Sequence, residues 1–158
     1  MKTNVFVSVP ALMCFVFTCL VFIGCEKQDA DTTKPVISLS EPEEGEEVRT
    51  GESMHLEMDL SDDVALAGYM VEVHNNFDHH GHKAPARAAE DSVVFYFKQS
   101  YEISGRNQHI HSHDVVIPAN AKAGDYHLMV YCTDAAGNQS FVARNIVLSP
   151  DAEHHHHE

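Results

Sequence analysis

The amino-acid sequence predicts an all-β protein, a sandwich of seven to eight antiparallel strands. Three observations lead to this fold class. Short runs of alternating apolar and polar residues recur along the chain, turn-forming residues separate them, and no stretch of useful length has the spacing of a helix. The runs fit within about 115 residues, which is the size of one sandwich domain.

The first half of the domain contains three predicted strands. Residues 35–39 begin the series. Residues 54–60 alternate strictly, with the methionine and leucine side chains on the inward face. Residues 69–74 alternate again, so that the tyrosine and valine side chains point inward and His74 points outward. A loop at 75–91 follows, which is too long to be a plain connection.

The second half contains four more runs of strand-forming residues. They occupy 93–97, the histidine-rich stretch 109–117, the clear alternation at 124–132, and 141–148. Residues 134–138 form a hairpin turn between the last two, where Gly137 and Asn138 suit positive φ angles.

This succession of strands fits an immunoglobulin-like sandwich. The opening residues 31–37, Asp-Thr-Thr-Lys-Pro-Val-Ile, resemble the start of bacterial immunoglobulin-like modules. The turn at 61–63, in combination with the segments 124–126 and 134–138, resembles them too. The resemblance covers residues 31–148. It implies the fold and little about function, because such modules serve many roles.

Residues 1–24 predict a targeting segment. A positively charged start precedes an almost wholly apolar run at 5–23, which ends at Gly24-Cys25. Residues 21–25 resemble a bacterial lipobox, which implies cleavage before Cys25 and acylation of its sulfur. The alternative is a transmembrane anchor, because about 19 apolar residues can span a bilayer. The small Gly24 and the polar residues after Cys25 favour the lipoprotein.

This interpretation divides the chain into four parts, which are a signal peptide at 1–24, a tether at 25–34, an immunoglobulin-like domain at 35–149 and a histidine-rich tail at 150–158. The expected location is the outer membrane, periplasmic or surface-exposed. Acidic residues after Cys25 resemble the surface-export signals of Bacteroidota lipoproteins. Cys132 is the one cysteine left in the domain, so we expect no disulfide and a thiol in the core.

The charge balance narrows the choice of partners. The chain has 24 acidic residues against 10 basic ones, a net charge of -14 at pH 7. Nucleic acid is excluded, because phosphate binding needs clustered lysine and arginine. The negative charge attracts cations. The expected partners are the membrane, through the lipid anchor, and other envelope proteins.

The sequence is rich in histidine, with 13 residues of this type. Imidazole is a good ligand for zinc, copper, nickel and cobalt. Residues i and i+2 of a strand share a face, roughly 6.5 Å apart, so His109, His111 and His113 line one face. Motifs similar to those of an uncharacterised, histidine-rich Bacteroidota lipoprotein family occur at 76–82, 109–111 and 126–127. The likeness implies no activity.

The face of the histidine-rich strand poses a conflict. If Val115 and Ile117 point inward, the same parity sends the three histidines inward, where unpaired imidazoles would be costly. Either a bulge near Asp114 switches the parity, or the histidine half of the strand runs out past the edge of the sandwich. We favour the second alternative.

Topology predicts a single shared site. The third and sixth core strands of an immunoglobulin-like sheet are antiparallel neighbours, so His74 and His127 should lie close together. We expect one zinc or copper site that draws on His74, Asp78, His79, His80, His82, His109, His111, His113 and His127. The alternative is that these are solvated side chains on a sheet surface. That is what we expect for His55, which stands alone on an outward face.

Two other features bear on metal binding. The tail histidines 154–157 are either native, and able to capture metal weakly, or the remnant of a purification tag. At the opposite end of the sandwich, two turns carry oxygen ligands of the kind that calcium prefers, namely Asp62, Asp63, Asp134 and Asn138. Since calcium takes 6–8 oxygens, we favour ordinary turn chemistry there.

Three functions compete. The expected one is a cell-envelope lipoprotein that binds zinc or copper for buffering, sensing or delivery. The second is a structural or adhesive surface module with no specific metal role. The third is an enzyme similar to copper–zinc dismutases, which also set His-x-His on a strand. Because no disulfide and no acid–base pair is visible, we expect that the protein is not an enzyme.

Overall fold

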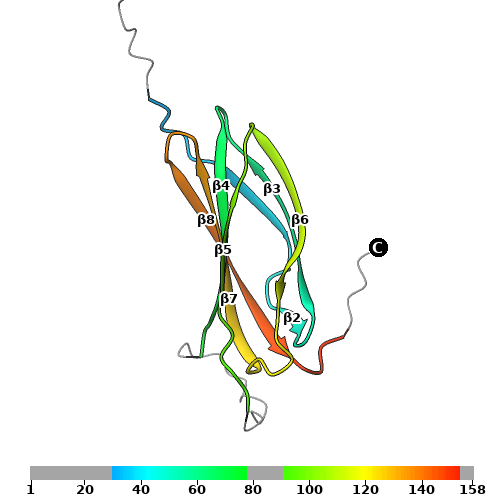
Figure 1. Cartoon of the computed structure of the whole chain (residues 1–158). Helices are drawn as coiled ribbons and strands as arrows, with labels where there is room; N and C mark the ends of the chain where they lie inside the picture. Colours follow the sequence, from blue (N-terminus) through cyan, green and yellow to red (C-terminus); the bar gives the residue numbers. More distant parts are fainter. Residues whose placement is uncertain (1–29, 78–90, 154–158) are drawn as a thin grey trace, which may run out of the picture.

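A computed structural model of the chain describes residues 30–77 and 91–153, which form a sandwich of two β-sheets (Figure 1). The three-stranded sheet has the order β1-β3-β6, and its strands are β1 (Val36–Glu41), β3 (Ser53–Ser61) and β6 (Asn107–Val116). The five-stranded sheet has the order β2-β8-β7-β4-β5, and its strands are β2 (Glu46–Arg49), β4 (Leu66–Asn75), β5 (Phe97–Glu102), β7 (Gly124–Asp134) and β8 (Gln139–Ser149). The predicted all-β sandwich is thus confirmed.

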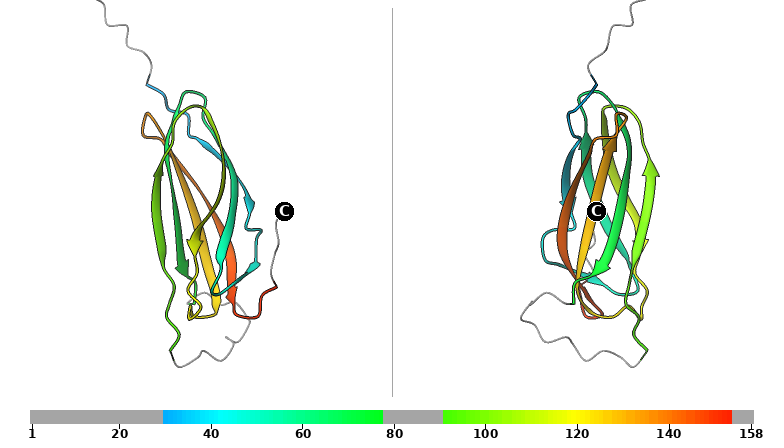
Figure 2. Two further views of the ribbon diagram at one scale, coloured as in Figure 1. Left: turned by 45° about the vertical axis from the view of Figure 1, so that its right-hand side comes forward. Right: turned by 90° about the vertical axis from the view of Figure 1, so that its left-hand side faces the viewer.

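The core lies between the two layers, which Figure 2 shows from two further sides. Alternate residues of each strand point into it, as the period of two in the sequence requires. The side chains that are at most 2% exposed come from both sheets and include Met54, Leu56, Met58, Leu60, Val71, Val73, Tyr126, Leu128, Val130, Cys132, Ile146 and Leu148. The residues between them face outward. Each strand that supplies core residues therefore also presents one face on the outside of the sandwich.

The pairing of β4 with β7 is antiparallel and lies next to the centre of the larger sheet, as expected for the third and sixth core strands. One pairing departs from the predicted antiparallel arrangement, because β2 runs parallel to β8. The chain leaves the three-stranded sheet after β1 and joins the edge of the other sheet as β2. The sequence pattern does not predict this strand, because only Val48 of its four residues is buried and no apolar alternation results.

The strand predicted at 93–97 was wrong in its position. The strand β5 begins at Phe97, opposite Val73, close to where β4 ends. The β4–β5 pairing starts at Phe97, and before it Val93 makes only an isolated bridge with Ala121. The apolar run therefore ends where the strand begins, and residues 94–96 belong to no strand.

Several sequence expectations fall outside the described residues. They concern the signal peptide with Cys25, the loop residues Asp78, His79, His80 and His82, and the tail histidines. Within the described ranges, no helix has the length and apolar character needed to cross a bilayer.

Tyr126 fastens the segment before β5 to the sandwich. Its ring is fully buried, and its hydroxyl donates to the carbonyl of Lys122 at 2.9 Å. The same oxygen accepts a hydrogen bond from the backbone N–H of Phe95 at 3.3 Å. One hydroxyl therefore satisfies two backbone groups from different segments.

We expect Tyr126→Phe to lower the free energy of unfolding by about 1–3 kcal/mol, because both backbone groups lose their partner in a buried place. Urea unfolding measures the change. Tyr96→Phe is the matched control, because Tyr96 is 58% exposed and its loss of a hydroxyl should cost almost nothing. Equal effects of the two changes would contradict this role for Tyr126.

Candidate metal centre

A β-bulge in β6 decides where the histidines point. Leu56 pairs with Ser112, but Met54 pairs with Val115, so His55 alone lies opposite two residues, His113 and Asp114. The extra residue switches the parity of β6. The histidines before the bulge face outward, whereas Val115 after it is 1% exposed and faces the core.

This resolves the parity conflict in favour of the bulge. The alternative that we favoured, a strand that runs out past the edge of the sandwich, is wrong, because β6 pairs with β3 along its whole length. Asp114 turns away from the histidines towards Tyr101 of β5. Burial raises the pKa of Tyr101 to about 12, and the charge of Asp114 and its hydrogen bond to the phenol add to the shift.

Three histidines gather beside the bulge. One ring nitrogen from each of His55, His111 and His113 lies within 4.8 Å of those of the other two. The ring centroid of His55 is 4.7 Å from that of His111 and 5.0 Å from that of His113. His55 is 9% exposed, and the other two are exposed. The group therefore has a buried floor and an open side towards solvent.

The expectation that His55 is a solvated residue was wrong. It belongs to the only histidine group of three that the described residues form. Its sequence neighbours gave no hint, since it alternates with Met54 and Leu56 like any outward residue of β3. The pairing of β3 with β6 would have revealed it, because that pairing sets His55 opposite the end of the histidine-rich stretch.

Acidic side chains accompany the histidines along the same face. In the β3–β6 ladder, Glu57 lies opposite His111 and Asp59 lies opposite His109. The carboxylate Oδ1 of Asp59 is 3.0 Å from Nδ1 of His109, which orients that ring. Glu57 Oε2 is 3.9 Å from Nε2 of His55. Carboxylates beside imidazoles commonly hold metal-binding histidines in place.

A shallow depression of about 190 Å³ adjoins His55 and His113. Its rim carries carboxylates from two distant parts of the chain, namely Glu46, Glu47, Glu52 and Glu153. A dense set of negative charges next to the imidazoles raises the local concentration of cations.

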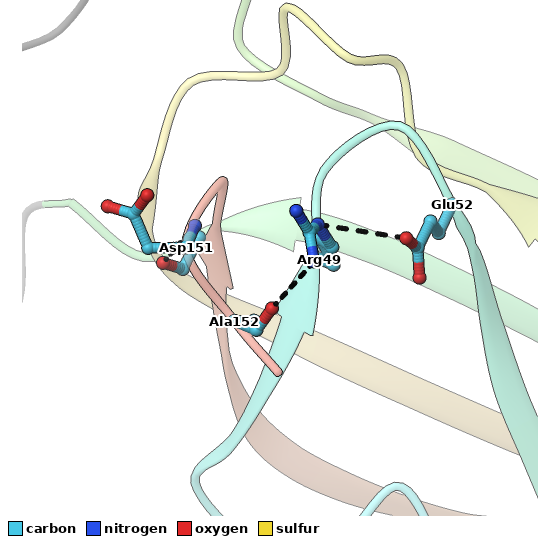
Figure 3. Close-up of polar contacts among 5 residues, drawn as sticks. Arg49, Glu52, Asp151 and Ala152 are labelled. Carbon is cyan, nitrogen blue, oxygen red and sulfur yellow. Dashed lines mark hydrogen bonds and ion pairs between the residues drawn. The ribbon is translucent and has the colours of Figure 1, made fainter. Parts of the chain in front are cut away.

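The C-terminal segment is fastened to this rim by Arg49 (Figure 3). The guanidinium of Arg49 donates to the carbonyl of Ala152 at 3.3 Å and lies 3.7 Å from the carboxylate of Glu52. Ala152 is 2% exposed. These contacts set Glu153 at the edge of the depression, a role that the sequence pattern did not suggest.

His74 and His127 form a separate pair. They are directly opposite in the β4–β7 ladder, with ring centroids 5.5 Å apart, so their predicted proximity is confirmed. Nδ1 of His74 lies 3.8 Å from the carboxylate of Glu72. Their strands belong to the five-stranded sheet, whereas His55, His111 and His113 belong to the three-stranded one.

The prediction of a single shared site was therefore wrong. Both sets of histidines face outward from a two-layer sandwich, and the hydrophobic core separates the layers. Stacked sheets lie about 10 Å apart before their outward side chains are counted. An ion held by His111 and His113 is thus out of reach of His74 and His127.

The turns that carry the acidic calcium candidates meet, as predicted. The N–H of Ala135 donates to the carbonyl of Ala65 at 2.9 Å. Asp134 is 2% exposed, and its carboxylate accepts hydrogen bonds from the backbone of Ala136 and Asn138 and from the side chain of Asn138. Asp134 and Asn138 are therefore hydrogen-bonded to each other. The cluster of three carboxylates consists of Asp62 and Asp63 together with Asp31.

Cys132 is no candidate for a ligand. It is fully buried, and burial raises the pKa of its thiol to about 11, with the charges of Asp62 and Asp134 adding to the shift. A thiol must lose its proton to bind metal. This agrees with the expectation that Cys132 is a core residue.

The group of His55, His111 and His113 can supply three nitrogen ligands to one ion. Zinc takes four ligands in a tetrahedron, and copper also accepts imidazole. Because two of the three rings are exposed, water or another molecule can occupy the remaining position. We therefore call this group the three-histidine site.

The sequence matches a known protein family over most of its length. Residues 23–149 match the family described as a domain of unknown function, DUF4625. The chain belongs to the DUF4625 family. No curated protein matches the sequence. The part of this DUF4625 chain that matches the family includes both histidine sets and the acidic turns, so each lies within the domain that defines the family.

We expect deletion of Asp114 from the DUF4625 chain to unfold or strongly destabilise it, by about 3–5 kcal/mol. Without the bulge, either the histidines turn inward or Val115 and Ile117 turn outward, and each buried aliphatic side chain contributes roughly 1.5–3 kcal/mol. Denaturant unfolding measures the change. Asp114→Ala keeps the length of β6 and should cost about 1 kcal/mol or less. A deletion no more harmful than the alanine variant would refute the role of the bulge.

Proposed function

We propose that this protein is a cell-envelope lipoprotein that binds a transition metal, zinc or copper, through His55, His111 and His113. The observation that carries the proposal is the convergence of one nitrogen from each histidine to within 4.8 Å of the others. Two residues of β6 and one residue of β3 supply the group, so the register of a rigid sheet holds it. Sites built on strands keep their geometry better than sites built on loops.

The surroundings support binding of a cation. The chain carries a net charge of -14, and carboxylates line the depression beside His55. They attract metal ions without themselves replacing the nitrogen ligands, which zinc and copper prefer. His109, held by Asp59 on the same face, lies two residues from His111 and extends the stripe of imidazoles.

A site that is open on one side suits exchange of the ion. A structural zinc site is closed by four protein ligands, whereas three ligands leave a position for a partner. Buffering, sensing or delivery at the envelope needs such exchange. We propose binding rather than catalysis, and the lipid on Cys25 would hold the domain at the outer membrane.

A specific observation favours the second candidate, a structural or adhesive module. The segment that precedes β5 exposes apolar side chains, with Val93 58%, Val94 45% and Tyr96 58% exposed. It leads into β5, which lies at the edge of the five-stranded sheet. An exposed sheet edge beside apolar side chains is a common place for another chain to bind. The two roles are compatible if the bound metal controls whether the partner binds.

We expect the intact chain, solubilised in detergent, to bind zinc or copper with an affinity that falls by about 100-fold or more in the double variant His111→Ala/His113→Ala. Both rings are exposed, so the fold should survive the change, whereas the loss of two of three ligands leaves no chelate. Competition with a chromophoric chelator measures the affinity. The tail histidines 154–157 are replaced by alanine in all samples, so that they take no part.

The matched control is His74→Ala/His127→Ala, which removes two outward imidazoles from the other sheet. We expect it to change the affinity by less than about threefold, on the scale where tenfold is about 1.4 kcal/mol. Equal losses in the two double variants, or no measurable binding in the parent, would refute the three-histidine site.

The affinity should also fall as the pH is lowered. An imidazole must be neutral to bind metal, and free imidazole takes up a proton near pH 6.5. We expect a steep loss between about pH 7.5 and pH 5.5, measured with the same competitor at each pH. An affinity independent of pH over this interval would show that histidine nitrogens are not the ligands.

A capture experiment from envelope extract, with and without chelator, separates the two candidate functions. A partner that binds only when metal is present supports the first. A partner that binds equally in both conditions, and is lost when Val94 and Tyr96 are changed to serine, supports the second.

A further inference from the structure

Three aspartates meet at the end of the sandwich where the described chain begins. Asp31 precedes β1, and Asp62 and Asp63 follow β3. One oxygen from each of the three carboxylates lies within 4.8 Å of those of the other two. In Figure 1 the blue start of the described chain and the turn between β3 and β4 lie together at the end opposite β2. The turn residues of the sequence predict Asp62 and Asp63 as candidates, but no sequence signal marks Asp31.

Each of the three carboxylates accepts hydrogen bonds from the chain through one of its oxygens. Oδ1 of Asp62 accepts hydrogen bonds from the backbone N–H groups of Val64 and Ala65, at 2.9 Å and 2.8 Å. Oδ1 of Asp31 accepts one from the backbone of Thr33, and Oδ2 of Asp63 accepts one from the hydroxyl of the same threonine. These bonds fix the orientation of all three carboxylates.

The remaining oxygen of Asp62 is the decisive one. The residue is only 8% exposed, and its Oδ2 is buried with no hydrogen-bond partner among the described residues. A buried polar atom without a partner costs about 1–3 kcal/mol, and more if it is charged. Such an atom leaves room for a partner that the described residues do not supply, a water molecule or an ion.

The charge of the cluster indicates what binds. No lysine, arginine or histidine nitrogen of the described chain lies within 4.0 Å of the three carboxylates. Three negative charges at this spacing repel one another, most strongly where burial excludes water. A cation between them would turn the repulsion into attraction.

We propose that Asp31, Asp62 and Asp63 bind a divalent cation of the calcium type. Carboxylate oxygens are the ligands that calcium prefers, and its coordination number and geometry are flexible. Asp63 is exposed and Asp31 is half-buried, so water completes the coordination on the open side. Zinc and copper favour the imidazoles at the other end of the molecule, so the two sites take different ions.

The position of this acidic site gives the ion a mechanical role. Asp31 lies just before β1, where the segment from the predicted lipid anchor enters the domain, and a cation joins it to the turn after β3. The side chain of Asn138 already holds the carbonyl of Asp31 at 3.1 Å. Calcium would therefore fasten the domain to its tether through two turns.

The test is the thermal unfolding of the intact chain in detergent, first with all divalent ions removed by a chelating resin and then with about 10 mM calcium chloride, above the range typical of extracellular calcium modules. We expect calcium to raise the unfolding midpoint by about 3–8 °C. In Asp62→Asn the shift should vanish. The asparagine oxygen still accepts the bonds from Val64 and Ala65, so without calcium this variant should unfold no earlier than the parent.

Asp63→Asn is the second variant, because this exposed residue can change without harm to the fold. We expect it to lose at least half of the calcium shift. Asp151→Asn removes one acidic charge at the other end of the chain and should keep the full shift. No shift in the parent, or a shift in Asp62→Asn and Asp63→Asn as large as that of the parent, would overturn the proposal.

The shift of the unfolding midpoint by calcium tests the acidic site independently of the three-histidine site. The variant His111→Ala/His113→Ala should keep the full calcium shift, and Asp62→Asn should keep the affinity of the parent for zinc. If calcium failed to stabilise the parent while the zinc affinity depended on His111 and His113, the acidic site alone would be refuted.

Discussion

The structure depends on one irregularity in an otherwise regular ladder, the bulge of His113 and Asp114 opposite His55. A regular strand would force the histidines and the aliphatic residues Val115 and Ile117 to share a face. Either the histidines would then be buried in the core or the aliphatic side chains would be exposed to water. Both are unfavourable, since imidazoles need water or ligands and aliphatic side chains need the core. The inserted residue lets both sets find their place within ten residues of chain.

The same bulge brings the histidines together. It places both residues of the bulge opposite a single position of β3, so that His113 lies beside the ring of His55 rather than further along the ladder. Because β3 is the central strand of its sheet, this position is rigid. A bulge that re-aims a side chain next to a functional site is a common use of this feature.

The distribution of ligand types follows the two ends of the sandwich. Imidazoles with nearby glutamates lie towards the end where β2 and the C-terminal segment pack, and carboxylates without imidazoles lie where the described chain begins. Imidazoles, which soft and borderline metal ions prefer, and carboxylates, which hard metal ions prefer, are therefore grouped at separate places on one small domain. The net negative charge attracts cations to the whole domain, while the two ends differ in the type of side chain that they present.

The sequence by itself determined β3, β4 and β7 with their inward faces, the tight turn at 134–138 and the closeness of His74 and His127. These follow from local alternation and from one rule of strand order, so no knowledge of distant contacts is needed. Only the tertiary structure decided which imidazoles lie together. That choice depends on the register between β3 and β6, and a register shift of one residue is invisible in the pattern of either strand alone. The same holds for Asp31, whose partners in the acidic site lie some thirty residues away in sequence and meet it because both segments reach one end of the sandwich.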